Sequence, residues 1–426
     1  MGQLKIPKIW RRALVVAIPK PEKSLGDPKS YQPISLLCVP FKILEKLIYA
    51  RVETVIDPLL PQEQASFRHG RSAVDQVTQL TQDIDDSFSA KKKAGAVFVD
   101  LTAAYNTVWR HGLVPASCCN CCRIDTWSTW SWRWLAIAAL PFPPDGQRSK
   151  LRRLKNGVPQ GSVLAPLLFN IYISDLPTTT SRKYEYLQIW KLKLSTTKTL
   201  SAAFHLNNKE AKRELKVNVS NETLPFCSET KCLGVTFDMS LTYRWHIESL
   251  HKKLTSCVAL LRRFAGSSWG AGATTLQTAT LVLVHSTAEY CAPVWCRSTH
   301  TCLIDPTINN ALRIVTGSLR PTTADNLPIL TGIQPAELCR SGATLSLGRQ
   351  AMEPGHTLHS ALTCTSSAVP ELFKSRHPFV HAAQQLISLS DNNQRRATAT
   401  LKISSLQLSL FAENTSGTTP LVTEQK

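Results

Sequence analysis

Two short segments of the sequence carry residue types suited to holding a metal ion or to bringing the backbone close to a ligand. The run Ala94–Asp100 predicts a buried strand that ends in a carboxylate. Asp100 is either a ligand for a divalent cation or a residue that caps the following turn, and the local pattern favours neither role. In Gly157–Gly161, glycine and proline predict a tight bend whose backbone can approach a ligand closely, with Gln160 as a polar contact. A plain β-turn before a helix is the alternative.

The elements around these segments follow from hydrophobic periodicity and from turn residues. Strands are predicted over Ala13–Ile18, Ala94–Asp100 and Lys231–Asp238, a loop over Tyr31–Leu37, and a strand-and-turn pattern over Gln188–Leu200. Helices are predicted over Phe41–Val55, Val74–Phe88, Leu164–Ile173, His246–Arg263, Leu276–Val284 and Thr307–Val315. Beyond Ser341 the pattern weakens. The chain is therefore expected to mix helices and strands and then become mostly helical.

Composition narrows the class of protein. The chain has 426 residues and 43% apolar residues, enough for two or three packed units. It has 49 Lys and Arg and 30 Asp and Glu, which gives a net charge of +19. This charge suggests a polyanionic binding partner, with nucleic acid as the first candidate. Ribosomal, chromatin-bound and membrane-surface proteins share such an excess of basic residues. No signal peptide or membrane-spanning run is found, so we expect an intracellular protein of the cytoplasm or nucleus, with no membrane partner and free thiols at its 13 cysteines.

The order of the short motifs is more specific than any one of them. The N-terminal motifs are Ile18-Pro19-Lys20-Pro21, Tyr31-Gln32-Pro33-Ile34-Ser35, Lys42-Ile43-Leu44-Glu45-Lys46 and Phe67-Arg68-His69-Gly70-Arg71-Ser72. They are followed by Val97-Phe98-Val99-Asp100, Ala104-Tyr105, Gly157-Val158-Pro159-Gln160-Gly161, Phe169-Asn170-Ile171-Tyr172 and Cys232-Leu233-Gly234-Val235. Over about residues 1–340 this succession resembles the reverse transcriptases of non-LTR (LINE-type) retrotransposons, particularly the jockey-like group.

The resemblance implies an α+β fold with the right-hand architecture of polymerases and with an incomplete palm. It places the fingers and the start of the palm in residues 1–92, the palm in 93–238, a helical thumb and connection in 239–341, and a weakly structured segment in 342–426. The implied activity is RNA-directed DNA polymerisation, with an RNA template, a DNA primer, dNTP and Mg²⁺. Oligomeric state is not implied.

The resemblance also assigns roles to single residues. Asp100 becomes a metal ligand and the catalytic carboxylate, and Tyr105 packs under the nucleotide sugar, a role compatible with that of a core aromatic residue. Gln160 and Gly161 belong to the nucleotide-binding turn. Lys20 meets the triphosphate, with a solvated surface lysine as the alternative.

Two positions depart from the family pattern. Gln32 stands where the family has arginine, so the grip on a triphosphate is expected to weaken, because a neutral amide cannot replace a forked guanidinium. Asn106 stands where the family usually has a second Asp, and this substitution is expected to reduce activity only mildly.

The main defect follows Ile173. The family continues to a hairpin with two adjacent aspartates that supply the remaining metal ligands, but no Asp-Asp pair occurs between Asp175 and Asp238. We therefore predict a deletion near Tyr184 and Glu185, a palm that lacks central strands, and a copy that is catalytically inactive. The alternatives are a non-catalytic nucleic-acid-binding remnant and an unstable pseudogene product.

A second defect spans Ala116–Pro144, which holds four of the 13 cysteines and four of the ten tryptophans. The run Cys118-Cys119-Asn120-Cys121-Cys122 contains Cys-x-x-Cys spacings that could bind zinc, but no second ligand pair stands at a suitable distance. We favour a frameshifted stretch, because reading one base earlier converts paired cysteine codons to leucine and several tryptophan codons to methionine.

Overall fold

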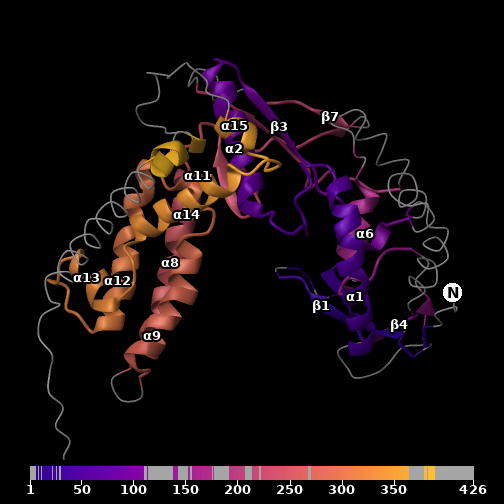
Figure 1. Cartoon of the computed structure of the whole chain (residues 1–426), viewed down its shortest axis with the longest axis horizontal. Coiled ribbons are helices and arrows are strands. Elements are labelled where there is room, and N and C mark those ends of the chain that lie inside the picture. The colour runs from indigo at the N-terminus through magenta and orange to yellow at the C-terminus, as the bar shows by residue number, and fades with distance from the viewer. Residues whose placement is uncertain are drawn as a thin grey trace, which may run out of the picture. The chain divides into compact units, whose positions relative to one another are not determined.

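The structure, a computed structural model, has two compact units (Figure 1). Unit 1 comprises Met1–Gln76 and Ala90–Leu241, and unit 2 comprises Val77–Ser89 and Thr242–Lys426. The residues described are 6–7, 9–10, 12–21, 23–24, 26–27, 30–109, 113, 138–142, 152–153, 156–174, 176, 191–206, 214–219, 222–266, 270–363, 379–380 and 382–388. The predicted defects near 184–185 and over 116–144, apart from 138–142, lie outside these residues.

One sheet of unit 1 has the strand order β2-β1-β4-β5, formed by β1 (Arg12–Pro19), β2 (Tyr31–Leu37), β4 (Ala138–Phe142) and β5 (Arg152–Arg153). Strand β1 runs antiparallel to β2 and parallel to β4. The predicted loop over Tyr31–Leu37 is wrong, because this segment pairs along its length with β1. Its Pro33 is tolerated because β2 lies at the edge of the sheet.

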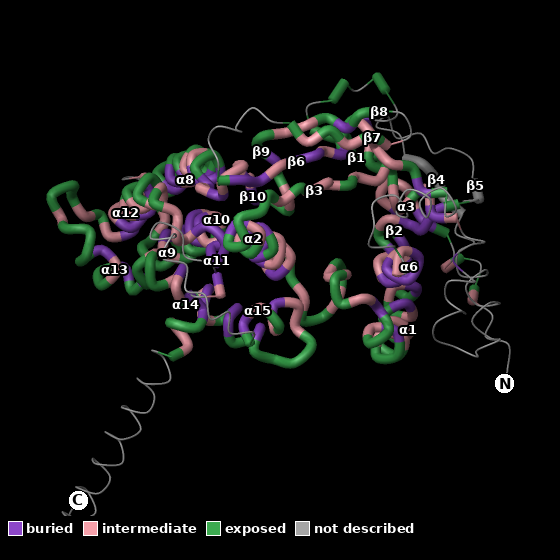
Figure 2. The backbone as a smooth tube through the Cα atoms, turned by 90° about the horizontal axis from the view of Figure 1, so that it is seen from above, coloured by how far each residue is buried: buried purple, intermediate pink, exposed green. Residues whose placement is uncertain are grey.

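Two helices form the core of unit 1. Helix α1 (Val39–Ile56) begins with a proline in its first turn, and α6 (Ala165–Tyr172) is buried over most of its length (Figure 2). Both match predicted helices. Their buried side chains pack into one cluster that includes Phe41 and Tyr172, with the short helix α3 (Ala104–Thr107) supplying Tyr105 at its edge. The short 3₁₀ turn η2 (Asp57–Leu59) follows α1.

A second group of strands in unit 1 carries Asp100. Strand β3 (Ala94–Phe98) pairs antiparallel with β6 (Leu200–Phe204). The predicted single strand over Lys231–Asp238 is wrong: it is a hairpin of β9 (Glu229–Cys232) and β10 (Val235–Asp238). Leu233 and Gly234 both have positive φ angles, of 46° and 89°, and turn the chain between the strands. A small hairpin is formed by β7 (Asn218–Val219) and β8 (Glu222–Thr223).

Unit 2 is helical. It contains most of α2 (Ala73–Ser89), then α8 (Arg244–Phe264), α9 (Ala273–Thr280), the π-helical η4 (Leu281–His285), α10 (Ser286–Ala288), α11 (Ala292–Trp295), η5 (Thr299–Leu303), α12 (Asp305–Thr316), α13 (Asn326–Thr331), α14 (Ala336–Ala351) and α15 (His359–Thr363). The predicted helices over α2, α8 and α12 are confirmed, and the prediction over Leu276–Val284 spans most of α9 and η4. Helices α8 and α12 pack against each other around buried side chains such as Leu254 and Ile308 (Figure 1). Among the described residues, no helix is both long enough and apolar enough to cross a membrane.

Candidate functional site

Asp100 lies just beyond the end of β3. Its backbone N–H donates to Thr199 Oγ1 at 3.2 Å, and its carbonyl oxygen accepts from the Ser195 N–H at 2.9 Å. These bonds attach the end of β3 to the turn that precedes β6. The carboxylate is 47% exposed, and its Oδ2 lies 3.6 Å from Nζ of Lys198. Asp100 is thus held at a strand end with its charge facing a cation from the protein itself.

A two-metal centre requires several carboxylates close together, because each ion prefers oxygen ligands and the two positive charges repel. Among the described residues, the only group of three or more His, Cys, Asp or Glu side chains close enough to share an ion is His285, Glu289 and Cys339, in unit 2. Asp100 belongs to no such group. The described residues of unit 1 therefore do not fit a two-metal centre.

The Gly157–Gly161 turn is bound to α3. The Gly157 N–H donates to Val108 O at 2.9 Å, and the Val158 N–H donates to Tyr105 O at 2.8 Å. Gly157 has a φ of 82°, and a Cβ there would come within 2.7 Å of the carbonyl oxygen of Asn106. Glycine is therefore required both by the backbone conformation and by the close approach of α3.

The other end of the turn is bound to β2. The Ser35 N–H donates to Gln160 O at 2.7 Å. Gly161 has a φ of 116°, and a Cβ at this position would clash with the carbonyl oxygen of Ser35. The turn thus joins the edge strand that carries Gln32 to the helix that carries Tyr105, so the structure brings three of the predicted residues, Tyr105, Gln160 and Gly161, onto one connected backbone frame.

Glu45 supports this frame, although the sequence predicted no separate role for it. It lies on α1 and is fully buried. Its carboxylate accepts the Ser162 hydroxyl and, at 2.9 Å, the Val163 N–H, just before the start of α6. A negative charge at this point is stabilised by the unpaired N–H groups and the dipole of α6. The only sequence signal was a glutamate within the apolar pattern of residues 41–48.

Tyr105 lines a cavity in unit 1 with a volume of about 390 Å³. Its ring stacks on Phe169, with ring centroids 5.1 Å apart and planes inclined by 16°. Its hydroxyl is buried and has no hydrogen-bond partner within the described structure, and burial raises the pKa of this phenol. Gln76 Nε2 and Asn170 Oδ1 line the same cavity and are also buried without partners there. The lining combines apolar side chains such as Phe67 and Ile173 with polar ones such as Glu63 and Gln64.

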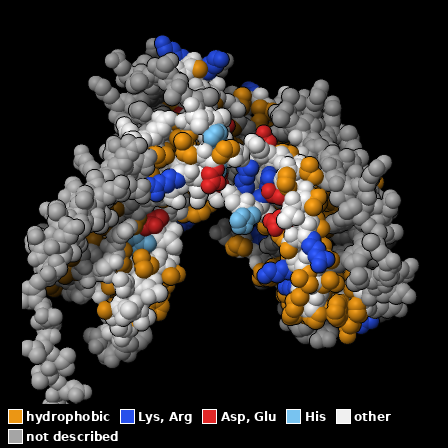
Figure 3. All heavy atoms as spheres, in the orientation of Figure 1, with side chains coloured by type: hydrophobic (Ala, Val, Ile, Leu, Met, Phe, Trp, Pro, Cys, Tyr) orange, Lys and Arg blue, Asp and Glu red, His pale blue; other side chains and the backbone are white. Residues whose placement is uncertain are grey.

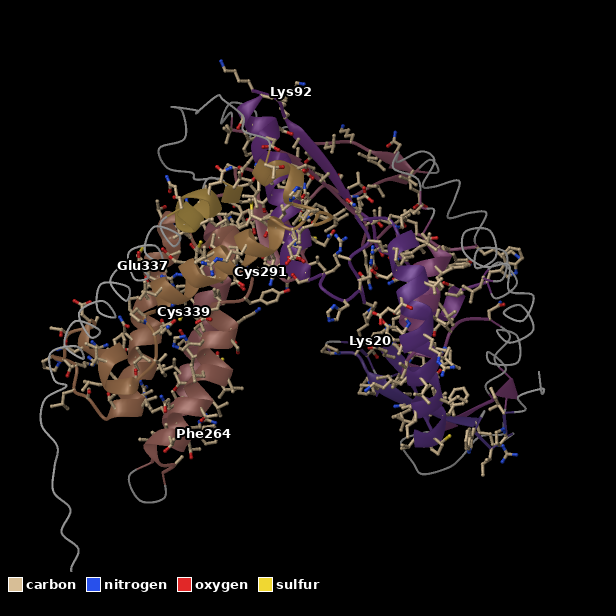
Figure 4. The ribbon with its side chains drawn as sticks, viewed as in Figure 1. Lys20, Lys92, Phe264, Cys291, Glu337 and Cys339 are labelled. Carbon is tan, nitrogen blue, oxygen red and sulfur yellow. The ribbon has the colours of Figure 1, made fainter. Side chains whose placement is uncertain are left out.

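Lys20 lies one residue beyond β1, at the tip of the β1–β2 hairpin, where it is exposed (Figure 4). Its backbone N–H donates to Ser30 O at 2.8 Å, which closes the loop between the strands. Gln32 stands opposite Ile18 in the same hairpin and is also exposed. A contact with a triphosphate at this tip stays a prediction for both residues.

Comparison with known proteins identifies the class. Residues 18–196 match the family model described as reverse transcriptase (RNA-dependent DNA polymerase). This range contains Lys20, Asp100, Tyr105 and the Gly157–Gly161 turn. The chain therefore carries a reverse transcriptase domain.

The relatives specify the kind of reverse transcriptase. The chain is 28% identical, over 337 residues, to the probable RNA-directed DNA polymerase from transposon BS of Drosophila melanogaster; this covers 68% of the chain and 35% of that relative. It is 29% identical, over 285 residues, to the RNA-directed DNA polymerase from mobile element jockey of Drosophila funebris, covering 57% of the chain and 31% of the relative. The domain is of the non-LTR retrotransposon type, as its motif order predicted. The chain spans about a third of the length of these relatives.

Proposed function

We propose that this chain is a non-LTR reverse transcriptase core that binds nucleic acid but does not polymerise DNA. The observation that carries the proposal is the surroundings of Asp100: its carboxylate is paired with Lys198, and it belongs to no described group of three or more side chains that could share an ion. Nucleotidyl transfer needs metal ions that activate the attacking hydroxyl and stabilise the leaving phosphate. A half-exposed carboxylate that is paired with a lysine and lies outside any such group does not hold these ions.

In this proposal unit 1 supplies the fingers and palm. The β1–β2 hairpin corresponds to the fingers, and β3, β6, α1 and α6 correspond to the palm. The connected frame of Tyr105, Gln160 and Gly161 supports the nucleotide-binding assignment, because Tyr105 lines the cavity and the turn is hydrogen-bonded to the Tyr105 backbone. The sugar of a dNTP is the group proposed to meet Tyr105. Mg²⁺, the metal of the implied reaction, has no complete ligand set among the described residues.

Unit 2 supplies the thumb in this proposal. Helix α8 exposes Lys252, Lys253, Arg262 and Arg263, and its last turn is basic. Lys and Arg side chains on an exposed helix can contact phosphates without reading the bases. Together with the net charge of +19, this supports binding of an RNA template and DNA primer that does not depend on Asp100.

An unstable product is the competing interpretation, and one feature of α1 favours it. Val39, Ile43 and Leu47, spaced four residues apart, are all exposed, and Figure 3 shows hydrophobic side chains gathered over this helix. Exposed apolar stripes promote aggregation when nothing covers them. A soluble chain that unfolds cooperatively would exclude this interpretation.

The test is primer extension with the purified chain, a homopolymer RNA template, a DNA primer, dNTPs and Mg²⁺, with Asp100→Ala in parallel. We expect no extension by either protein and equal gel shifts of the template–primer by both. Extension by the parent chain that Asp100→Ala abolishes would refute the proposal of inactivity. Absence of any gel shift would refute the proposal of binding.

A further inference from the structure

Three side chains of different chemistry converge in unit 2. His285 is the last residue of η4, Glu289 directly follows α10, and Cys339 lies on α14 (Figure 4 labels Cys339). One ligand atom of each, an imidazole nitrogen, a carboxylate oxygen and a sulfur, lies within 4.8 Å of the other two. The Nδ1 of His285 and Oε1 of Glu289 are 2.8 Å apart. None of these residues belongs to the predicted polymerase site.

The histidine side of the cluster is enclosed, and the carboxylate side is open. The His285 side chain is 5% exposed, and its Nε2 is buried with no hydrogen-bond partner in the described part of the chain. The Glu289 side chain is 32% exposed, and Cys339 is half-buried. An ion can therefore reach the three ligand atoms from solvent, while the imidazole is held in place by the packed interior.

The backbone also points to a specialised position. Residues Leu281–His285 form a π-helical turn inside an otherwise α-helical segment. Such turns are uncommon and occur frequently at functional sites, because the extra residue rotates a side chain out of the normal helical register. Here the turn ends at His285 and directs it toward Glu289 and α14.

We propose that His285, Glu289 and Cys339 bind a zinc ion, with water as the fourth ligand. Imidazole nitrogen, thiolate sulfur and carboxylate oxygen are the three ligand types that zinc accepts together, whereas magnesium and calcium prefer oxygen alone. Ligand atoms about 2.1 Å from a tetrahedral zinc lie about 3.4 Å apart, so Nδ1 and Oε1, at 2.8 Å, must separate by about 0.6 Å. A rotamer adjustment of the partly exposed Glu289 is enough for this.

Binding exchanges protons for the metal. Without an ion, a proton lies between Nδ1 of His285 and Oε1 of Glu289, and burial followed by Glu289 raises the pKa of Cys339 to about 11. Zinc takes the lone pair of Nδ1, so the proton shared with Glu289 passes to Nε2 of His285 or to solvent, and the thiol proton of Cys339 is released to solvent as the thiolate binds. The Cys339 Sγ, now 3.8 Å from Gln334 O, moves onto the ion. The ion would join α14 to the η4–α10 segment and stabilise unit 2 by closing the intervening chain.

The binding experiment uses the full chain with Cys118, Cys119, Cys121 and Cys122 replaced by serine, which removes the other closely spaced thiols. Zinc binding is measured by equilibrium dialysis, and Co²⁺ is used as a spectroscopic probe of thiolate ligation. We expect about one zinc per chain and a sulfur-to-cobalt charge-transfer band. Cys339→Ser should weaken zinc binding at least tenfold and remove the band, whereas Cys302→Ser, at an exposed cysteine, should change neither.

A second measurement does not depend on any variant of the site. Alkylation of each cysteine in the same protein is followed by mass spectrometry, with and without zinc. Zinc should slow alkylation of Cys339 at least tenfold and leave Cys302 unchanged. The proposal is overturned if zinc does not protect Cys339, or if Cys339→Ser binds zinc as tightly as its parent.

Discussion

Replacing Glu45 should destabilise unit 1 strongly, although this residue touches no predicted substrate. In Glu45→Ala, the Val163 N–H and the Ser162 hydroxyl lose their buried acceptor, and a cavity replaces the side chain. Hydrogen bonds to a charged group contribute about 1.5–3 kcal/mol each, so we expect a loss of about 3–5 kcal/mol in the free energy of unfolding. Glu45→Gln keeps an acceptor oxygen and should cost about half of this.

The assay is urea denaturation followed by circular dichroism and by limited proteolysis of the connection before α6. The matched control is Lys46→Ala, the exposed neighbour on the same helix, which should change the free energy of unfolding by less than about 0.5 kcal/mol. If Glu45→Ala and Lys46→Ala unfold at the same urea concentration, then the buried carboxylate does not support the turn, and the reasoning is refuted.

Two further predictions follow from the same unit. Gly161→Ala should lower the free energy of unfolding by about 2 kcal/mol or more, measured by thermal unfolding, because its φ of 116° and the carbonyl oxygen of Ser35 both exclude a Cβ. The control is Gly70→Ala: Gly70 also has a positive φ but has open space around it, so this variant should lose less. Equal losses in the two variants would contradict the clash at Gly161. Burial, followed by Glu53, raises the pKa of Tyr49 from 10.0 to about 12. The pKa of Tyr49 is higher in the folded than in the unfolded chain. The contribution of this phenol to the free energy of unfolding is therefore fully present below pH 10 and is lost as the pH rises toward 12. Ultraviolet titration should show Glu53→Gln lowering this pKa, and no change would contradict the assignment.

The order of the motifs was enough to recognise the family, and periodicity was enough to place the longer helices. Helices α1, α2, α6, α8 and α12 occur where the sequence predicts them, because each has an apolar face repeated over several turns. The roles of Asp100, Lys20, Tyr105 and Gln160 in binding and catalysis stay predictions. The absence of aspartate between Asp175 and Asp238 is a property of the sequence alone and motivates the proposed loss of activity.

Tertiary structure decided the features that depend on distant partners. Strand β2 forms because residues 31–37 pair with β1, and Lys231–Asp238 becomes a hairpin because positive φ at Leu233 and Gly234 reverses the chain. Hydrophobic periodicity reports only which face of a segment is buried, so it contains no information on pairing. The same limit hid the contacts of Glu45 with residues 162–163 and of Asp100 with Lys198, and the convergence of His285, Glu289 and Cys339. Each of these contacts joins residues far apart in the sequence, or on different elements, and exists only after the chain has packed.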